Sequence, residues 1–139
     1  MAYFPKVLSD TVDFINVMTY DYHGYSELRP WTQNNAPLYS VPNDEAQNQN
    51  SDFAMEYWKI KGADPAKLLI GIPAYGRGYI LKDQNQFGLF APAVGPIPKP
   101  LNISDPRHTG YWAFNEYCDR MRTEADSWTV YRVRMEKLD

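Results

Sequence analysis

Two short apolar runs decide the fold of this chain of 139 residues: residues 12–19, which read VDFINVMT, and residues 68–72, which read LLIGI. In the first run, both faces of an extended strand carry mostly apolar side chains. A strand that is apolar on both faces is typical of a parallel sheet that is covered on both sides. The two runs therefore predict neighbouring strands of an α/β fold.

The segment between these runs predicts the helix that a parallel pair requires. Ser51 or Asp52 is a candidate N-cap, and Gly62 stands where a C′ glycine belongs. Apolar side chains recur at helical spacing from Phe53 to Ile60. The order strand, helix, strand is a βαβ unit, whose connection implies parallel pairing.

The rest of the chain is less regular. Residues 25–50 are polar and punctuated by proline, so we expect a long surface connection. Residues 88–100 are dense in proline and glycine and predict a loop, residues 109–123 predict a helix, and residues 129–134 alternate like an edge strand. A βαβ unit followed by an α+β segment indicates an insertion attached to a barrel or a doubly wound sheet.

Composition excludes several classes of function. The net charge of −3 leaves no basic stripe for nucleic acid, and no segment approaches the ~20 apolar residues of a membrane span. The first ten residues lack the features of a signal peptide, and the single cysteine excludes an internal disulfide. His23 and His108 have no partners at ligand spacing, so we expect no metal site and no cofactor.

Candidate binding residues follow the two predicted strands. Ligands of parallel sheets bind beyond the carboxyl ends of the strands. We expect the first strand to end in Tyr20 and Asp21, and the second to end in Tyr75 and Arg77. Two phenols, a carboxylate and a guanidinium can hydrogen-bond an uncharged polar ligand, and tyrosine rings can stack on a sugar. The residue types alone leave open the alternative of two core tyrosines and an ordinary Asp21–Arg77 ion pair.

Four segments, in order, resemble motifs of glycoside hydrolase family 18, the chitinases and chitinase-like lectins. Residues 18–24, MTYDYHG, resemble M-x-Y-D-x-H-G at the sixth strand of that family, and residues 35–39, NAPLY, resemble the segment that follows it. Residues 68–77, LLIGIPAYGR, resemble the seventh strand, and residues 110–118, GYWAFNEYC, resemble a helix of the insertion domain. The resemblance implies a partial (β/α)8 TIM barrel in residues 1–80 and part of an α+β insertion domain in residues 81–139.

The resemblance also implies an activity and roles for individual residues. The family hydrolyses β-1,4-linked N-acetylglucosamine, with the acetamido oxygen of the substrate as nucleophile. Tyr20 and Asp21 match catalytic positions: Tyr20 steadies the acetamido group, and Asp21 hydrogen-bonds the sugar beside it. Met18 matches the apolar floor under the sugar, and Tyr75 and Arg77 match substrate-binding positions. The implied partner is chitin or a chito-oligosaccharide.

The catalytic acid of the family has no match in this chain. Family enzymes carry D-x-x-D-x-D-x-E at the fourth strand; Asp10 and Asp13 begin like it, but Ile15 and Val17 stand in the places of the third Asp and the Glu. The chain therefore resembles a fragment or a truncated gene product, and we expect it to be inactive alone. Two hypotheses for the parent stay open: the first is a chitinase, and the alternative is a chitinase-like lectin.

Two further features bear on the cellular compartment. Cys118 matches a family cysteine that pairs with one farther along the insertion domain, so the resemblance places its partner outside this chain. Residues 102–104, NIS, form an N-glycosylation acceptor pattern. Both agree with an extracellular, secreted parent, although this chain has no signal peptide of its own.

Overall fold

The computed structural model describes residues 3–98 and 109–132 and divides into two compact units. The described residues of unit 1 are 3–22 and 36–72, and those of unit 2 are 23–35, 73–98 and 109–132. The glycosylation pattern at residues 102–104 and His108 lie outside the described residues.

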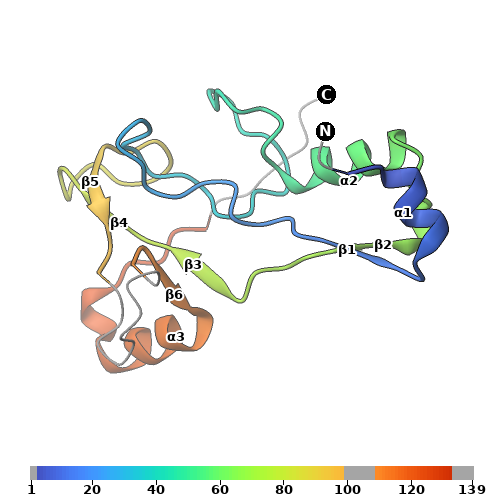
Figure 1. The fold of residues 1–139 in the computed structure, drawn as a ribbon. Coiled ribbons are helices and arrows are strands. Elements are labelled where there is room, and N and C mark those ends of the chain that lie inside the picture. The colour runs from blue at the N-terminus through green and yellow to red at the C-terminus, as the bar shows by residue number, and fades with distance from the viewer. Residues whose placement is uncertain (1–2, 99–108, 133–139) are drawn as a thin grey trace. The chain divides into compact units, whose positions relative to one another are not determined.

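Unit 1 contains the predicted βαβ unit (Figure 1). Its elements are α1 (Pro5–Thr11), β1 (Ile15–Val17), α2 (Ser51–Ile60), a 3₁₀ helix (Pro65–Lys67) and β2 (Leu68–Ile70). Strands β1 and β2 pair in parallel, with Ile15 opposite Leu68 and Val17 opposite Ile70. The predicted parallel pair is confirmed, although each strand is shorter than its apolar run.

The ends of α2 follow the sequence closely. The N-cap is Asn50, one residue before the predicted Ser51 or Asp52, and its side-chain oxygen accepts a hydrogen bond of 2.8 Å from the backbone N–H of Phe53. Gly62 adopts a positive φ of 91° just beyond the C-cap, in the left-handed conformation that favours glycine at this position.

The sequence did not predict α1, which is held in unit 1 by polar contacts near its C-terminal end. The ammonium group of Lys67 donates to the carbonyl oxygens of Ser9 (2.6 Å) and Val12 (2.9 Å). The hydroxyl of Ser9 accepts from the backbone N–H of Asp64 at 2.9 Å. A cation at a helix C-terminus complements the helix dipole and binds carbonyls that the helix leaves without a partner.

The burial of the βαβ unit is one-sided, which corrects the expectation of two covered faces. Val17 and Thr19 are buried on one face of the first strand, whereas Phe14 and Met18 on the other face are 58% and 69% exposed. On α2, Ile60 is 76% exposed. No described residue covers these apolar side chains, because two strands and two helices enclose only one face of the sheet.

Unit 2 is built from two antiparallel strand pairs and a helix. Its elements are β3 (Tyr75–Arg77), β4 (Tyr79–Leu81), β5 (Ala93–Pro96), β6 (Tyr111–Ala113), α3 (Phe114–Thr123) and a 3₁₀ helix (Ala125–Ser127). Strand β3 pairs with β6, and β4 pairs with β5.

The predicted helix over residues 109–123 is wrong in its first part. Residues 111–113 form β6, and α3 begins at Phe114 after the N-cap Ala113, whose backbone N–H donates to the Glu116 carboxylate at 2.7 Å. The pairing with β3 takes the three residues before the helix into a strand. Residues 129–132 form no strand, and the last two residues of that predicted strand lie outside the described part of the chain.

Part of the predicted surface connection is fastened to unit 2 through Thr32. The backbone N–H of Thr32 donates to the carbonyl of Ala91 at 2.9 Å, and its carbonyl accepts from Phe90 at 2.8 Å. The Thr32 hydroxyl accepts from the N–H of Ala91 at 2.9 Å and donates to the carbonyl of Gly88. These bonds tie residues 23–35 to the loop before β5.

Replacing Lys67 with Met should lower the free energy of unfolding by about 1–2 kcal/mol, because two backbone carbonyls lose a charged donor. Lys59→Met is the matched control: Lys59 pairs with Glu56 on the exposed side of α2, and such surface pairs contribute about 0–1 kcal/mol. Chemical denaturation of both variants measures the difference. Equal losses in the two variants would contradict the role given to Lys67.

Candidate functional site

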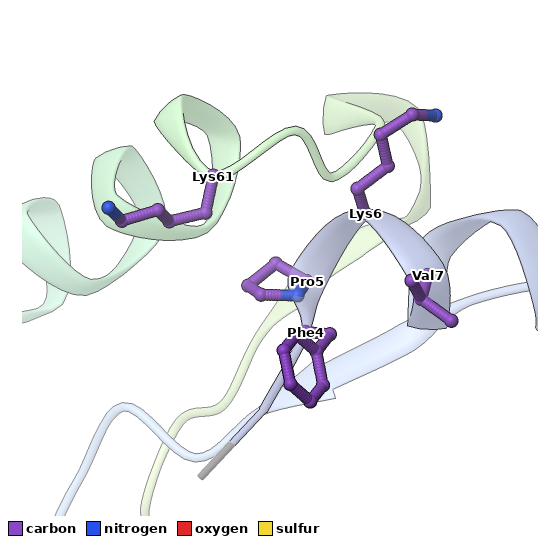
Figure 2. Close-up of a pocket in the computed structure, with 5 residues that line it drawn as sticks. All are labelled: Phe4, Pro5, Lys6, Val7 and Lys61. Carbon is purple, nitrogen blue, oxygen red and sulfur yellow. The ribbon is translucent and has the colours of Figure 1, made fainter. Parts of the chain in front are cut away.

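A hollow of about 190 Å³ lies at the start of α1 (Figure 2). It is lined by Phe4, Pro5, Lys6, Val7 and Lys61. The ammonium group of Lys6 pairs with the carboxylate of Asp10 at 2.9 Å. Apart from the two lysines, the residues that line the hollow are apolar. The hollow contains none of the residues that the sequence predicts for the site, so it is not the candidate site.

The carboxyl end of β1 is fixed by the wholly buried Thr19. Its hydroxyl donates to the carbonyl of Gly71 at 2.7 Å, and its carbonyl accepts from the hydroxyl of Ser51 at 3.4 Å. The N–H of Gly71 donates to the carbonyl of Val17 at 2.9 Å. The backbone before Tyr20 is therefore held by the chain that follows β2 and by the start of α2.

Gly71 makes room for the ring of Tyr20. A Cβ atom at residue 71 would lie 2.8 Å from Cε1 of Tyr20 and 2.7 Å from the carbonyl oxygen of Val17. Real Cβ atoms do not approach so closely, so only glycine lets this ring lie against the backbone. Gly71 was not among the predicted site residues, although a glycine that interrupts an apolar run often marks a close backbone approach.

Asp21 follows in the left-handed conformation, with φ of 62°. Non-glycine residues there cost of order 1 kcal/mol, and Asp tolerates it better than most. Such residues cluster at functional sites. Met18, Tyr20 and Asp21 follow directly after β1 in unit 1, and we treat them as one group. Met18 is exposed and Tyr20 is partly buried.

Tyr75 and Arg77 form the second group, in unit 2. The prediction that they end the second parallel strand is wrong, because β2 ends at Ile70 and these residues belong to β3, which pairs antiparallel with β6. They stand two residues apart on β3 and so project from one face of the β3–β6 pair, which we call the front face. Gly76 projects from the back face, where a Cβ atom would lie 3.0 Å from the ring of Tyr117 on α3. The helix thus covers the back face and requires a residue without a side chain there.

The front face brings Tyr111 to the predicted pair. Tyr111 lies opposite Arg77 in the register, and the Arg77 guanidinium carbon stands 4.6 Å from the centre of its ring. The rings of Tyr75 and Tyr111 are 5.9 Å apart and tilted by 58°. Gly24 approaches from the preceding loop: a Cβ atom there would lie 3.4 Å from Nη1 of Arg77. The sequence analysis missed Tyr111, since only the pairing of β6 with β3 reveals its neighbours.

Each group carries side chains that can hydrogen-bond a polar ligand. In unit 1 the Asp21 carboxylate can accept hydrogen bonds, and in unit 2 the Arg77 guanidinium can donate them. Burial raises the pKa of Tyr22, and burial also raises the pKa of Tyr79, whose hydroxyl donates to the carbonyl of Gln33 at 3.4 Å. Both phenols therefore stay protonated at neutral pH. Within residues 3–98 and 109–132, no three His, Cys, Asp or Glu side chains gather as a metal site would require.

Gly71→Ala should lower the free energy of unfolding by about 1–3 kcal/mol, because the added methyl overlaps the Tyr20 ring and the Val17 carbonyl. Gly95→Ala is the matched control, since the nearest atom to its Cβ position is 3.8 Å away. Thermal and chemical denaturation compare the two variants. If Gly71→Ala is no less stable than Gly95→Ala, the close approach of Tyr20 is wrong.

Comparison with known proteins connects this chain to a family. The model of glycosyl hydrolases family 18 matches residues 3–137. The oviduct-specific glycoprotein of Bos taurus is 39% identical over 127 residues, which are 91% of this chain and 22% of that protein. Probable chitinase 10 of Drosophila melanogaster is 38% identical over 124 residues, which are 88% of this chain and 5% of that protein. The chain thus spans a quarter or less of these relatives.

Solved structures of a chitinase and a pseudo-chitinase are also similar to this chain. Catalytic domain 2 of the Ostrinia furnacalis Group II chitinase, in a mutant complexed with penta-N-acetylchitooctaose, has a TM-score of 0.81 at 34% identity and covers 95% of this chain and 33% of its own. Human YKL-39, a pseudo-chitinase with retained chitooligosaccharide binding, has a TM-score of 0.73 at 30% identity and covers 86% of this chain and 32% of its own.

The predicted fold class, a partial (β/α)8 barrel with part of an α+β insertion domain, is confirmed by these neighbours. Within the described residues, no helix is long and apolar enough to cross a membrane. The family model spans nearly the whole chain, and the relatives match it over about nine-tenths of its length. The chain therefore belongs to glycosyl hydrolases family 18.

Proposed function

We propose that this chain carries part of a chito-oligosaccharide cleft, with Met18, Tyr20, Asp21, Tyr75 and Arg77 as its sugar-binding residues. The observation that carries the proposal is the strand end at Tyr20 and Asp21, where one ring rests on Gly71 and one carboxylate stands on a left-handed backbone. This is the end of a parallel strand where barrel enzymes bind their substrates.

In the parent protein, the proposed reaction is retaining hydrolysis of β-1,4-linked N-acetylglucosamine. The acetamido oxygen attacks the anomeric carbon while the glycosidic C–O bond breaks and the leaving oxygen takes a proton from a carboxylic acid. Water then attacks the anomeric carbon of the oxazolinium ion, restores the acetamido group and leaves the configuration retained. Tyr20 donates its hydroxyl proton as a hydrogen bond to the acetamido oxygen and so orients it for attack, and Asp21 accepts from the acetamido N–H. Met18 provides an apolar floor, and Tyr75 and Arg77 bind substrate.

In this proposal the chain binds the sugar but does not supply the catalytic proton. The leaving group needs an acid, and the family motif that supplies it matches nothing in this sequence. We further propose that residues 1–80 belong to the barrel and residues 81–139 to the insertion domain. The parent is secreted, and Cys118, free in this structure, pairs with a cysteine outside the chain.

The second candidate function is that of a chitinase-like lectin. YKL-39 supports it, since that pseudo-chitinase retains chitooligosaccharide binding and resembles this chain at 30% identity. The sequence of the parent transcript discriminates the two functions. A Glu at the last position of the fourth-strand motif identifies an enzyme, and a residue without a carboxyl group identifies a lectin.

The isolated chain should release no fluorophore from a fluorogenic chitobiose substrate, because the proton donor is absent. The assay compares the purified chain with a heat-treated sample of the same preparation. Turnover above the heated control would mean that another group supplies the proton, and this part of the proposal would be wrong.

Tyr20→Phe and Asp21→Asn should each weaken the binding of chitopentaose by about tenfold, the equivalent of about 1.4 kcal/mol for a lost hydrogen bond. Tyr57→Phe and Asp10→Asn are matched controls, because they make the same chemical changes on α2 and α1, away from the end of β1. Isothermal titration calorimetry measures all four variants. Equal affinity in the site variants and the controls would remove Tyr20 and Asp21 from the proposed site.

A further inference from the structure

We infer that Tyr111 is a positioning residue that holds Arg77 and Tyr75 in place for the sugar, an inference that rests on the proposed function. Tyr111 belongs to β6, more than 30 residues from both Tyr75 and Arg77 in the sequence. The contacts of its ring with both proposed sugar-binding side chains point to the role.

The strand register places the three side chains together. Arg77 and Tyr111 are directly opposite in the antiparallel pair, and Tyr75 is the diagonal neighbour of Tyr111 on the same face. Opposite residues have Cβ atoms roughly 5 Å apart, and diagonal pairs are within reach of aromatic and long side chains. The ring of Tyr111 accordingly stands 4.6 Å from the Arg77 guanidinium carbon and 5.9 Å from the Tyr75 ring.

A ring beneath the guanidinium limits how far Arg77 can move. An arginine side chain has several rotatable bonds, and fixing it when a ligand binds costs affinity. Stacking on Tyr111 fixes the guanidinium before the ligand arrives, through the attraction between a cation and an aromatic face. Gly24 adds a second boundary, because its Cβ position would be 3.4 Å from Nη1 of Arg77.

The back face supports the strand pair without Tyr111. There, Trp112 packs against Tyr117 with ring centres 5.4 Å apart, and the guanidinium of Arg120 stacks 4.3 Å from the Trp112 ring. The indole N–H of Trp112 also donates to the carbonyl of Pro98 at 3.0 Å. A change at Tyr111 should therefore leave β6 paired and affect the front face alone.

The back face also offers a matched control. Arg120 on Trp112 is an arginine stacked on an aromatic residue of the same strand, but it faces away from Tyr75 and Arg77. Arg120→Gln removes that stacking without touching the front face. The Arg120→Gln variant should therefore bind chitopentaose with the affinity of the wild-type chain.

The test compares Tyr111→Leu, which removes the ring, with Tyr111→Phe, which keeps it. We expect Tyr111→Leu to weaken chitopentaose binding by roughly tenfold, the cost of ordering one or two side chains. Tyr111→Phe should stay within about twofold of wild type, since the aromatic face remains. Tyr111→Met is the second variant if Tyr111→Leu loses helical circular dichroism.

Two further readouts separate positioning from direct contact with the sugar. In wild type and Tyr111→Phe, the side-chain protons of Arg77 should show upfield ring-current shifts by NMR, and these should vanish in Tyr111→Leu. In the background of the Arg77→Met/Tyr75→Leu double variant, Tyr111→Leu should cause no further loss of affinity. A full additional loss would mean that Tyr111 binds the sugar itself and would overturn the positioning role.

The remaining outcomes distinguish the inference from the proposed function. Unchanged affinity in Tyr111→Leu, together with a wild-type chain that binds chitopentaose, overturns the role of Tyr111 and leaves the proposed cleft intact. No binding by the wild-type chain overturns both.

Discussion

The hydrogen bond from the Thr19 hydroxyl to the carbonyl of Gly71 is the contact on which the first half of the proposed cleft depends. It joins the end of β1 to the segment after β2 at 2.7 Å, in a place where Thr19 is wholly buried. A buried hydroxyl without a partner is costly, so this bond strongly favours one register of the two strands. The same register sets the ring of Tyr20 on Gly71 and turns the chain into the left-handed Asp21.

In unit 2 the second group is held in place by the packing of α3 against one face of the β3–β6 pair. The other face carries polar and aromatic side chains. Gly76 is the element that makes this division possible, because any side chain there would meet the ring of Tyr117. Tyr75, Arg77 and Tyr111 then share the front face, which presents two phenols and a guanidinium in mutual contact.

The sequence predicted the features that depend on local pattern. The parallel strands, the helix α2 and the C′ glycine at Gly62 follow from periodicity and capping, and the structure has them, although Ile60 of the predicted apolar stripe is exposed. Helix α1 was not predicted, because seven residues are too few to display a helical period. Strand β6 escaped because its pairing with β3 joins segments more than 30 residues apart, which no local pattern reports.

The same distinction holds for the site. Tyr20, Asp21, Tyr75 and Arg77 could be named because they end or follow apolar runs, whereas Gly71 and Tyr111 become visible only through contacts across strands. The expectation of burial on both faces of β1 failed, since burial depends on what covers a strand. Phe14 and Met18 remain exposed in a chain that spans about a third of the length of its structural neighbours.

Binding of a chito-oligosaccharide at the group at the end of β1 and at the group on β3 is the central claim. Its most direct test is an NMR titration of the isotope-labelled chain with chitopentaose, in which each backbone amide reports on its own surroundings. We expect saturable shifts at Tyr20, Asp21, Tyr75 and Arg77, and none at the hollow beside Lys6. Absence of saturable shifts, or shifts confined to that hollow, would contradict the account.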